Sequence, residues 1–531
     1  DQILIWVARK IGDILPFVGG PEHAAALIPI FETLCGAEET IVRAAASQSA
    51  CKVLSKLEPS HNSIALQYLG LLKKLADHES AEVFYARVSA AAIVPDVYRT
   101  LSDPADLAAV VEVYSSLSRD DMTIVRRGAA LSLPKLAEFA SAPHLANEVF
   151  QFLKLFISDD CPPVQIAGTS AVSAVVKMMK SKECSRPTGD IVAIVKACVE
   201  DHSWKTRTSI AQNYSVFATC FDEADIRAEV FPLVGTLLLD PETDIRVLAA
   251  LAAVSFVDVV GVDEYLKEIV PVCQQLSDDD AAPARKAVAD LVVDSAVKVG
   301  QDAAAAHLSP LIIKFIGDAD PMVRIRIIAK LPAIVEKLPQ VFNRLTTTLQ
   351  GLFSDSNWRV KKQLILGMPA VVKHMGQAYF LEQFLQAYLV TFKDAVSETR
   401  EAAAEVLPVI CHATDESTSW VHERVFPTVK TMATDEYLLR VTMLGAVKAL
   451  MQAENLTEVF AEEVIGLIIG ATADAVPNIR LRAAETMAEV VKKTTVPPAI
   501  LERIRPVIAE MAANDKDKDV KYYAAEALKS L

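Results

Sequence analysis

The sequence predicts an all-α fold, an α-solenoid (superhelix) in which pairs of short helices repeat along the whole chain. Three observations support this prediction. The chain has 531 residues, more than a single hydrophobic core accommodates. Hydrophobic residues make up 52% of it, whereas glycine contributes 18 residues and proline 26, a composition that favours helices. A short signature also recurs, most often every 39 residues, which indicates a repeat array.

The signature is an acidic residue, a few polar residues, Val or Ile, then Arg or Lys, and an alanine-rich segment, as in DPETDIRVLAALAAV and DAVPNIRLRAAETM. We use the basic position as the marker of each repeat. The thirteen markers lie 37 to 44 residues apart and are Arg43, Arg87, Arg126, Gln165, Arg207, Arg246, Arg285, Arg324, Lys361, Arg400, Arg440, Arg480 and Lys521. We therefore expect one solenoid over residues 1–531. Residues 1–17 would be the second helix of a truncated repeat, and about 18–531 would form thirteen complete repeats.

An aspartate stands six residues before the marker in ten of the thirteen units. We expect it in the turn between the two helices of a repeat, where its carboxylate accepts hydrogen bonds from free backbone N–H groups at a helix start. The marker then falls in the first turn of the second helix. Stacked repeats would place each marker near the aspartate of a neighbour, which predicts a ladder of charge-assisted hydrogen bonds. The Val or Ile before the marker is expected in the core.

Residues 308–338 illustrate one unit. LSPLIIKFIG is expected as the first helix, because its apolar residues are three and four apart. DADP is the turn, with Pro321 at the start of the second helix, MVRIRIIAKLPAIVEKL. One pair cannot bury its apolar face, but stacked pairs share a continuous core. Repeats of about 40 residues with two helices are typical of the HEAT class.

Composition and motifs argue against several functions. A net charge of −15 without a dense basic cluster disfavours nucleic-acid binding. Eight scattered cysteines predict reduced thiols in an intracellular compartment, and we expect the chain in the cytoplasm and also in the nucleus. No apolar run is long enough for a membrane span. Metalloprotease, hydrolase and nucleotide-binding motifs are missing, so we expect no enzyme activity, metal or cofactor.

Two local features admit a chemical interpretation that the pattern disfavours. Cys411 and His412 are adjacent, and neighbours on a helix point apart, so we do not expect a nucleophile–base pair. The acidic runs 278–280 and 515–519 recur at the phase of the other turns and lack the glycine and final glutamate of a calcium loop. We expect these aspartates to cap turns.

Three turns carry an aromatic residue where other units have small or polar residues, namely Trp204, Trp358 and Tyr437. Such a side chain either covers the neighbouring turn or, together with arginine, serves as a hot spot for a partner protein. The periodicity leaves both interpretations open.

Several stretches resemble the scaffold (A, 65 kDa regulatory) subunit family of protein phosphatase 2A. They are VGGPEHAAALIP with EETIVR at 18–43, SRDDMTIVRR at 118–127, EDHSWKTR at 200–207, DSNWRVKKQL at 355–364 and DKDVKYYAAEAL at 517–528. The resemblance is colinear and covers essentially the whole chain. It implies a non-catalytic scaffold of HEAT repeats. In that family the turns of the last five repeats bind the phosphatase catalytic subunit, and those of earlier repeats bind interchangeable regulatory (B-type) subunits.

Carried over by position, the resemblance implies two sets of site residues. The catalytic-subunit site would contain Trp358, Arg359, Tyr437, Asn478, Asp519 and Val520. The regulatory-subunit site would contain Arg126, Arg127, Trp204 and Lys205. The chain departs from the family at Thr123, where proline is usual, and at Lys205, where arginine is usual. The choice of regulatory subunit is therefore left open.

Two other hypotheses remain. A nuclear-transport or other HEAT-type adaptor would bind a small GTPase or Phe-Gly peptides. A HEAT-like enzyme, such as a base-removing glycosylase, would need a basic concave face, which the net charge of −15 disfavours.

Overall fold

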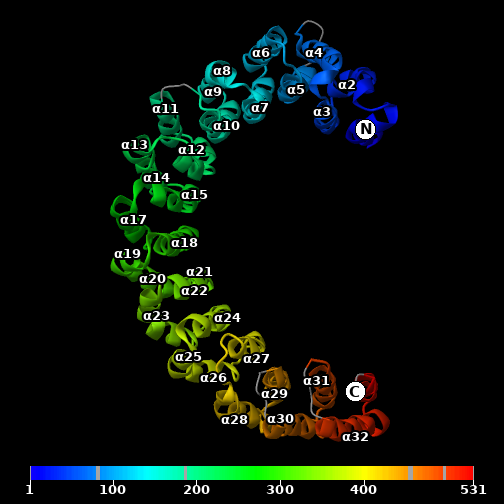
Figure 1. Cartoon of the computed structure of the whole chain (residues 1–531), viewed down its shortest axis with the longest axis vertical. Coiled ribbons are helices and arrows are strands. Elements are labelled where there is room, and N and C mark those ends of the chain that lie inside the picture. Colours follow the sequence, from blue (N-terminus) through cyan, green and yellow to red (C-terminus); the bar gives the residue numbers. More distant parts are fainter. Residues whose placement is uncertain (1, 79–83, 185–187, 453–457, 494–497, 530–531) are drawn as a thin grey trace. The chain divides into compact units, whose positions relative to one another are not determined.

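The computed structural model describes residues 2–78, 84–184, 188–452, 458–493 and 498–529. These residues form α-, 3₁₀- and π-helices, and none of the described segments is a strand. The chain divides into two compact units, residues 1–272 and 273–531. Within each unit one helix pair follows another along the chain (Figure 1). The predicted all-α solenoid of two-helix repeats is confirmed.

The helices of the first unit are, in chain order, α1 (Gln2–Lys10), η1 (Ile11–Val18), η2 (Pro21–Leu27), α2 (Ile28–Cys35), α3 (Thr40–Leu54), η3 (Pro59–His61), α4 (Asn62–Ala76), α5 (Tyr85–Thr100), α6 (Pro104–Ser118), α7 (Thr123–Phe139), α8 (Ala142–His144), η4 (Leu145–Val149), α9 (Phe150–Ile157), α10 (Pro162–Ser181), α11 (Thr188–Val199), α12 (Trp204–Ala211), η5 (Tyr214–Thr219), α13 (Glu223–Asp225), η6 (Ile226–Val230), α14 (Pro232–Leu238), α15 (Thr243–Ala253), η7 (Val254–Phe256), α16 (Val257–Val260) and α17 (Val262–Leu276). The boundary between the units falls within α17.

Those of the second unit are α18 (Ala282–Val299), α19 (Gln301–Ala303), η8 (Ala304–Leu308), α20 (Ser309–Ile316), α21 (Pro321–Ala329), α22 (Leu331–Lys337), α23 (Pro339–Leu352), α24 (Trp358–Met375), α25 (Gln377–Gln383), α26 (Leu385–Thr391), α27 (Ser397–Cys411), η9 (Val421–Val425), α28 (Phe426–Thr431), η10 (Met432–Thr434), α29 (Tyr437–Gln452), α30 (Glu458–Ala471), α31 (Pro477–Lys493), α32 (Pro498–Asn514) and α33 (Lys518–Leu528).

The second helices of successive repeats stack on one another. In the first unit α3, α5, α7, α10, α12 and α15 are in contact in that order, and in the second unit α18, α21, α24, α27, α29, α31 and α33 are. All thirteen markers lie in these helices; Arg126 and Arg207, for example, are the fourth residues of α7 and α12. The residues before them, Val125 and Thr206, are fully buried. The predicted phase of the repeat is therefore confirmed.

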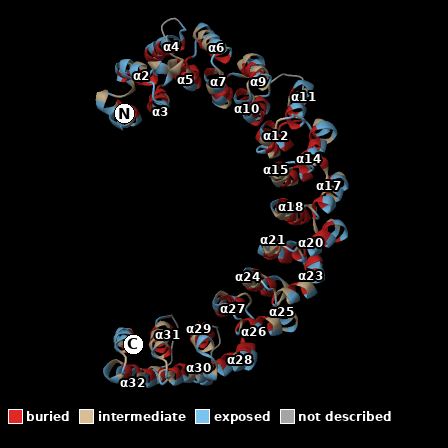
Figure 2. Ribbon diagram, turned by 180° about the vertical axis from the view of Figure 1, so that it is seen from behind, coloured by how far each residue is buried: buried red, intermediate tan, exposed pale blue. Residues whose placement is uncertain are grey.

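Small residues allow the stacked helices to approach closely. Ala129 and Ala130 of α7 are fully buried, as expected for the alanines after a marker. At Gly168 of α10 the approach is closer still, because a Cβ there would lie 2.7 Å from the Cβ of Phe156 in α9. Buried residues run along the contact between the two helices of each pair (Figure 2). The core is thus continuous within each unit.

The predicted ladder is present in both units. Arg207 Nε donates to Asp240 Oδ2 at 2.6 Å, and Nη2 donates to Oδ1 at 3.0 Å. The same pairing of a marker with the aspartate of the next repeat occurs at Arg87–Asp120, Arg126–Asp159, Gln165–Asp201, Arg285–Asp318, Arg324–Asp355, Lys361–Asp394, Arg440–Asp474 and Arg480–Asp515. Buried charge-assisted bonds of this kind fix the spacing of neighbouring repeats.

Each ladder aspartate also closes its own turn. Asp240 accepts from the backbone N–H of Glu242 at 2.8 Å, and Glu242 is the residue that precedes α15. The carboxylate thus lies at the helix start, as expected, and it binds the N–H of the residue just before the helix. In the acidic runs, Asp279 and Asp515 make the same bond to Ala281 and Asp517 at 2.8 Å each, so the turn-cap interpretation is confirmed.

Two markers pair differently. Arg400 Nε donates to Thr442 Oγ1 at 2.8 Å, because Thr434 stands where the next repeat would place its aspartate. The guanidinium of Arg43 stacks on the ring of Tyr85, 4.5 Å from the ring centroid. At both positions a neutral group replaces the usual carboxylate.

Proline interrupts several helices that the pattern predicts as continuous. The second helix expected over 322–338 ends at Ala329 and resumes at Leu331, because Pro332 lacks the N–H that would continue the hydrogen-bond ladder. The described first helices contain four π-turns; η6, η8 and η9 are each followed within two residues by proline, whereas η4 is not. The segment 1–17 is α-helical only to Lys10, after which η1 contains Pro16.

Candidate protein-interaction surface

Seven of the ten predicted site residues occupy the same two positions of the repeat, three and two residues before the marker, where the second helix begins. We call these positions the helix-start surface. The seven are Trp204, Lys205, Trp358, Arg359, Tyr437, Asn478 and Asp519. Arg126, Arg127 and Val520 lie at other positions.

In the second unit, Trp358 and Arg359 form a stacked pair. Asn357 Oδ1 caps α24 by accepting from the backbone N–H of Arg359 at 2.9 Å. The Arg359 guanidinium lies 4.5 Å from the centroid of the Trp358 ring, and Lys362 Nζ lies 5.9 Å from it. Trp358 is half-buried and Arg359 exposed. A cation held on an indole face gives a partner a large, ordered amphipathic contact.

Two repeats further on, Tyr437 and Asn478 are brought together. Asn478 Nδ2 donates to the Tyr437 hydroxyl, which joins the starts of α29 and α31. Tyr437 remains 38% exposed, and its neighbour Leu438 is 53% exposed. The interpretation that Tyr437 merely covers a neighbouring turn therefore accounts for only part of its surface.

The repeat between these two groups carries Glu398 at the helix start. The pKa of Glu398 is lowered, first by its own backbone N–H, then by Ser397, with further contributions from the charges of Lys362 and Arg359. The helix-start surface of the second unit is therefore mixed, with an acid beside the Trp358–Arg359 stack.

At the last repeat the structure separates Asp519 from Val520. Asp517 caps α33 by accepting from the backbone N–H groups of Asp519 and Val520 at 2.9 and 3.2 Å. Asp519 is exposed, whereas Val520 is fully buried. Val520 directly precedes the marker Lys521, a position that points to the core in other repeats too. Its burial confirms the prediction from the repeat pattern, and the contact with the catalytic subunit that the resemblance implies for Val520 stays a prediction.

In the first unit, Trp204 and Lys205 form a second exposed stack. Trp204 is 48% exposed, and Lys205 Nζ lies 5.7 Å from the centroid of the Trp204 ring. Arg127 is also exposed. Arg126 is different, because it donates to Asp159 at 2.8 and 3.1 Å and its side chain is only 16% exposed. Its guanidinium is engaged in the ladder, as the spacing predicts, and the contact with a regulatory subunit that the resemblance implies for it stays a prediction.

Sequence reasoning missed other exposed apolar residues of the helix-start surface. Ile41 is 58% and Ile124 42% exposed in the first unit, and Met322 is 48% exposed in the second. Each lies two residues before its marker. The phase of the repeat alone would have identified them.

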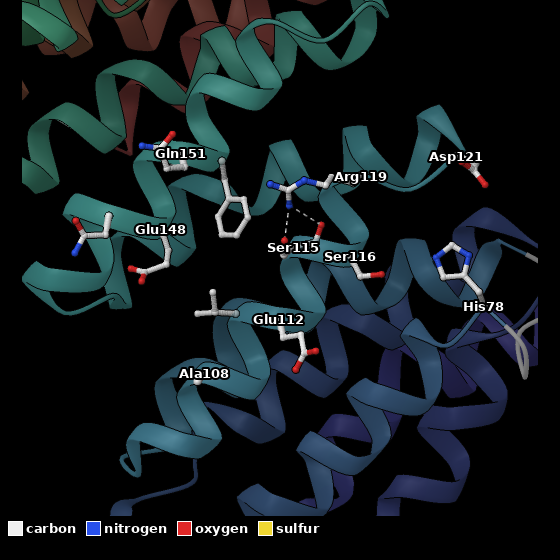
Figure 3. A pocket seen from close by; sticks show the side chains of 12 residues that line it. His78, Ala108, Glu112, Ser115, Ser116, Arg119, Asp121, Glu148 and Gln151 are labelled. Atoms are coloured by element: carbon white, nitrogen blue, oxygen red, sulfur yellow. Dashed lines mark hydrogen bonds between the residues drawn. The ribbon is translucent and has the colours of Figure 1, made fainter.

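A polar hollow of about 870 Å³ lies on the first helices α6 and α9 of the first unit (Figure 3). Arg119 Nη1 donates to the Ser115 carbonyl at 3.2 Å, and Figure 3 shows these two residues between Glu148 and His78. His78 Nε2 lies 3.4 Å from the ladder carboxylate of Asp120. No hydrogen bond links His78 to a serine among the described lining residues.

Two further kinds of chemical site find no support in the geometry. Cys411 is buried, which raises its pKa to about 12, while His412 is exposed, so the two do not form a catalytic pair. Within the described ranges, no cluster of three or more His, Cys, Asp or Glu side chains is arranged to hold a metal ion.

None of the described helices is long and apolar enough to cross a bilayer.

Comparison with known proteins identifies relatives by sequence. No protein-family model matches the chain. The alpha isoform of the 65 kDa regulatory (A-type) subunit of serine/threonine-protein phosphatase 2A from Arabidopsis thaliana is 39% identical over 151 residues, 28% of this chain and 24% of that protein. The human beta isoform is 26% identical over 342 residues, 63% of this chain and 55% of its own length. The protein phosphatase 2A scaffold subunit of Dictyostelium discoideum is 31% identical over 153 residues, 28% and 24% of the two chains.

These alignments span between 24% and 55% of the relatives' lengths. Among solved structures, Kap95p in a study of its binding to RanGDP superposes with a TM-score of 0.56 at 12% identity, over 98% of this chain and 73% of that chain. Importin beta gives 0.53 at 11% identity, over 99% and 71%. At such low identity these neighbours show the fold alone. The sequence relatives are named as regulatory or scaffold subunits and not as catalytic ones. By sequence, this chain is related to the 65 kDa regulatory (A-type) subunits of protein phosphatase 2A.

Proposed function

We propose that the chain is a non-catalytic scaffold of a protein phosphatase 2A holoenzyme. Its second unit binds the serine/threonine phosphatase catalytic subunit through the helix starts of the last five repeats. Its first unit binds a regulatory subunit. The observation that supports this most directly is the naming of its sequence relatives as scaffold or 65 kDa regulatory subunits of phosphatase 2A.

The helix-start surface supports the division into two sites. Each unit carries its own indole–cation pair, the exposed Trp204 with Lys205 and the half-buried Trp358 with Arg359. Tryptophan and arginine are the residues most enriched among interface hot spots. A chain that holds an enzyme and a specificity subunit together raises their effective concentration without chemistry of its own.

The catalytic-subunit site is tested by replacing Trp358 and Arg359 with alanine together. Truncating a hot-spot aromatic costs about 2 kcal/mol or more, so we expect affinity for a purified phosphatase 2A catalytic subunit to fall roughly thirtyfold. Met322→Ala is the matched control, because Met322 is a 48% exposed residue of the same surface one repeat before the proposed site. Unchanged binding by the double variant, or an equal loss by the control, would contradict the site.

The regulatory-subunit site is tested in the same way with Trp204→Ala and Lys205→Ala. We expect loss of a B-type regulatory subunit from the assembled complex with retention of the catalytic subunit. Loss of both partners would argue against separate sites. Binding of a small GTPase in place of either partner would favour the adaptor hypothesis.

A further inference from the structure

A second cation joins the Trp358–Arg359 stack of the helix-start surface. Lys362 lies four residues after Trp358 on α24, so the two side chains share a face of the helix. Lys362 Nζ lies 5.9 Å from the centroid of the indole ring, and the Arg359 guanidinium lies 4.5 Å from it. One half-buried ring thus carries two positive charges. Lys362 is not among the residues that the resemblance implies for the catalytic-subunit site.

Neither of these two cations has a carboxylate partner. Within the described ranges Arg359 and Lys362 take part in no ion pair, and the bond from Arg359 to Asn357 comes from its backbone N–H and not from its guanidinium. The marker Lys361 is different, because its amine is engaged by the ladder carboxylate of Asp394. Arg359 is exposed and Lys362 is partly exposed. Both charges are therefore free to meet a carboxylate from outside the chain.

The next repeat carries acids at the matching positions. Glu398 of α27 stands two residues before its marker, as Arg359 does, and Glu401 stands one residue after it, as Lys362 does. The helices α24 and α27 pack against each other. Ser397 Oγ donates to Glu398 Oε2 at 3.1 Å, and neither glutamate forms an ion pair with the cations of α24 within the described ranges. Two positive charges on one helix thus adjoin two negative charges on the next.

This order of charges restricts where an acidic residue of a partner can lie. A charge that is covered by a partner loses water, and it is stabilised there only by an opposite charge. A partner carboxylate is attracted by the cations of α24 and repelled by the glutamates of α27. The pattern therefore sets the register of the partner along the helix-start surface as well as its affinity.

We propose that Lys362 and Arg359 together receive one carboxylate of the phosphatase catalytic subunit, an aspartate or glutamate side chain that lies beside the Trp358 ring. Glu398 and Glu401 exclude that carboxylate from the next repeat. The inference rests on the proposed function for the identity of the partner, and it adds Lys362 as a residue that selects the partner by charge.

The test measures the affinity of the full chain for the purified catalytic subunit at low and high salt. At low salt we expect Lys362→Gln to weaken binding about threefold and Lys362→Glu about tenfold, because the first removes an attraction and the second adds a repulsion. Both losses should shrink at about 1 M salt, where the screening length is about 3 Å. Lys362→Arg keeps the charge and should bind like the wild type.

Lys286 provides the matched control. It is a partly exposed lysine of the second unit, one residue after the marker Arg285 and so at the same position of the repeat as Lys362. It precedes the last five repeats, so Lys286→Gln and Lys286→Glu should leave binding unchanged. Three results would each overturn the proposal: equal losses at the two lysines, losses that persist at high salt, or a loss with Lys362→Arg as large as that with Lys362→Gln.

Zero-length crosslinking of the complex identifies the group that Lys362 meets. A carbodiimide activates a carboxyl group, and a lysine amine in contact with it displaces the reagent as a urea and forms an amide. We expect mass spectrometry to find Lys362 joined to an aspartate or glutamate of the catalytic subunit. This product should be absent from Lys362→Arg, because a guanidinium does not react. Crosslinks of Lys362 only to Glu398 or Glu401, or crosslinks from other lysines alone, would overturn the proposal.

Failure of this inference can be told apart from failure of the proposed function. If Trp358→Ala with Arg359→Ala abolishes binding of the catalytic subunit while Lys362→Glu binds like Lys286→Glu, the role of Lys362 is refuted and the proposed function stands. If the wild-type chain does not bind the catalytic subunit, the proposed function itself is refuted.

Discussion

Replacing one arginine of the ladder tests whether these ion pairs hold neighbouring repeats together. Arg207 makes two hydrogen bonds to Asp240, at 2.6 and 3.0 Å, from α12 to the turn before α15. The side chains are 14% and 5% exposed. Arg207→Ala takes both of these donors away from a buried carboxylate, which keeps its bond from the backbone N–H of Glu242.

The expected cost follows from that geometry. Removing one partner of a buried pair costs about 3–5 kcal/mol, and since Arg207 is slightly exposed we expect about 3 kcal/mol, roughly a hundredfold in a local opening equilibrium. Arg207→Gln should cost about half as much. The chain itself shows that glutamine can serve there, because Gln165 Nε2 donates to Asp201 at 3.0 Å.

Hydrogen exchange measured by mass spectrometry is the appropriate assay. Repeat arrays open locally, so a single global unfolding free energy is not the relevant quantity. Amides of α12, α14 and α15 should exchange faster in the order wild type, Arg207→Gln, Arg207→Ala. Replacement of the exposed Lys196 on α11 by alanine serves as the control. Equal effects of the two Arg207 variants, or faster exchange spread evenly over the chain, would refute the reasoning.

Two further predictions concern packing and pH. Gly168→Ala should lower the thermal unfolding midpoint, because the new Cβ would lie 2.7 Å from Phe156 Cβ, which costs about 1–3 kcal/mol of stability. Gly70→Ala, on the open surface of α4, should raise the midpoint, because it adds up to about 1 kcal/mol of stability. A fall of the midpoint at both positions would refute the argument from contact, because Gly70 has no atom within 4 Å of the new Cβ. Arg480 lowers the pKa of Asp515 by hydrogen bonding, so this pair's contribution to stability is full above the unfolded-state pKa of about 3.9 and is lost as pH falls through the lower folded value. Exchange of α33 amides, corrected for its intrinsic pH dependence, should rise below about pH 4 in the wild type and show no such step in Asp515→Asn.

Much of the fold was predictable from the sequence because each repeat follows the same local rule. The spacing of aspartate and marker placed the turn, the start of the second helix and the ladder pairing, and the structure bears out each of them at Arg207 and Asp240. The helix breaks at Lys330 and in the π-turns were missed. They depend on how the free carbonyls near proline are accommodated, which hydrophobic periodicity does not encode.

The candidate site was predictable only as a set of positions. The resemblance selected Trp358, Arg359 and Tyr437, and the structure places all three at helix starts with Arg359 stacked on Trp358. The resemblance by itself did not separate the exposed Asp519 from the buried Val520, whereas the phase of the repeat did, because Val520 directly precedes the marker Lys521. The spacing rule, in contrast, did predict that Arg126 pairs with an aspartate of the next repeat, and Asp159 is that aspartate.

By itself, then, the sequence determined the length and phase of the repeat and the family that the chain resembles, because each of these depends on residue types at fixed spacing. The tertiary structure decided which of those residues remain available. Stacking leaves Trp204 48% exposed and Trp358 half-buried, and it brings Asn478 to the hydroxyl of Tyr437. The physical reason is that availability depends on what the neighbouring helix covers, and that contact joins residues about forty positions apart in the chain.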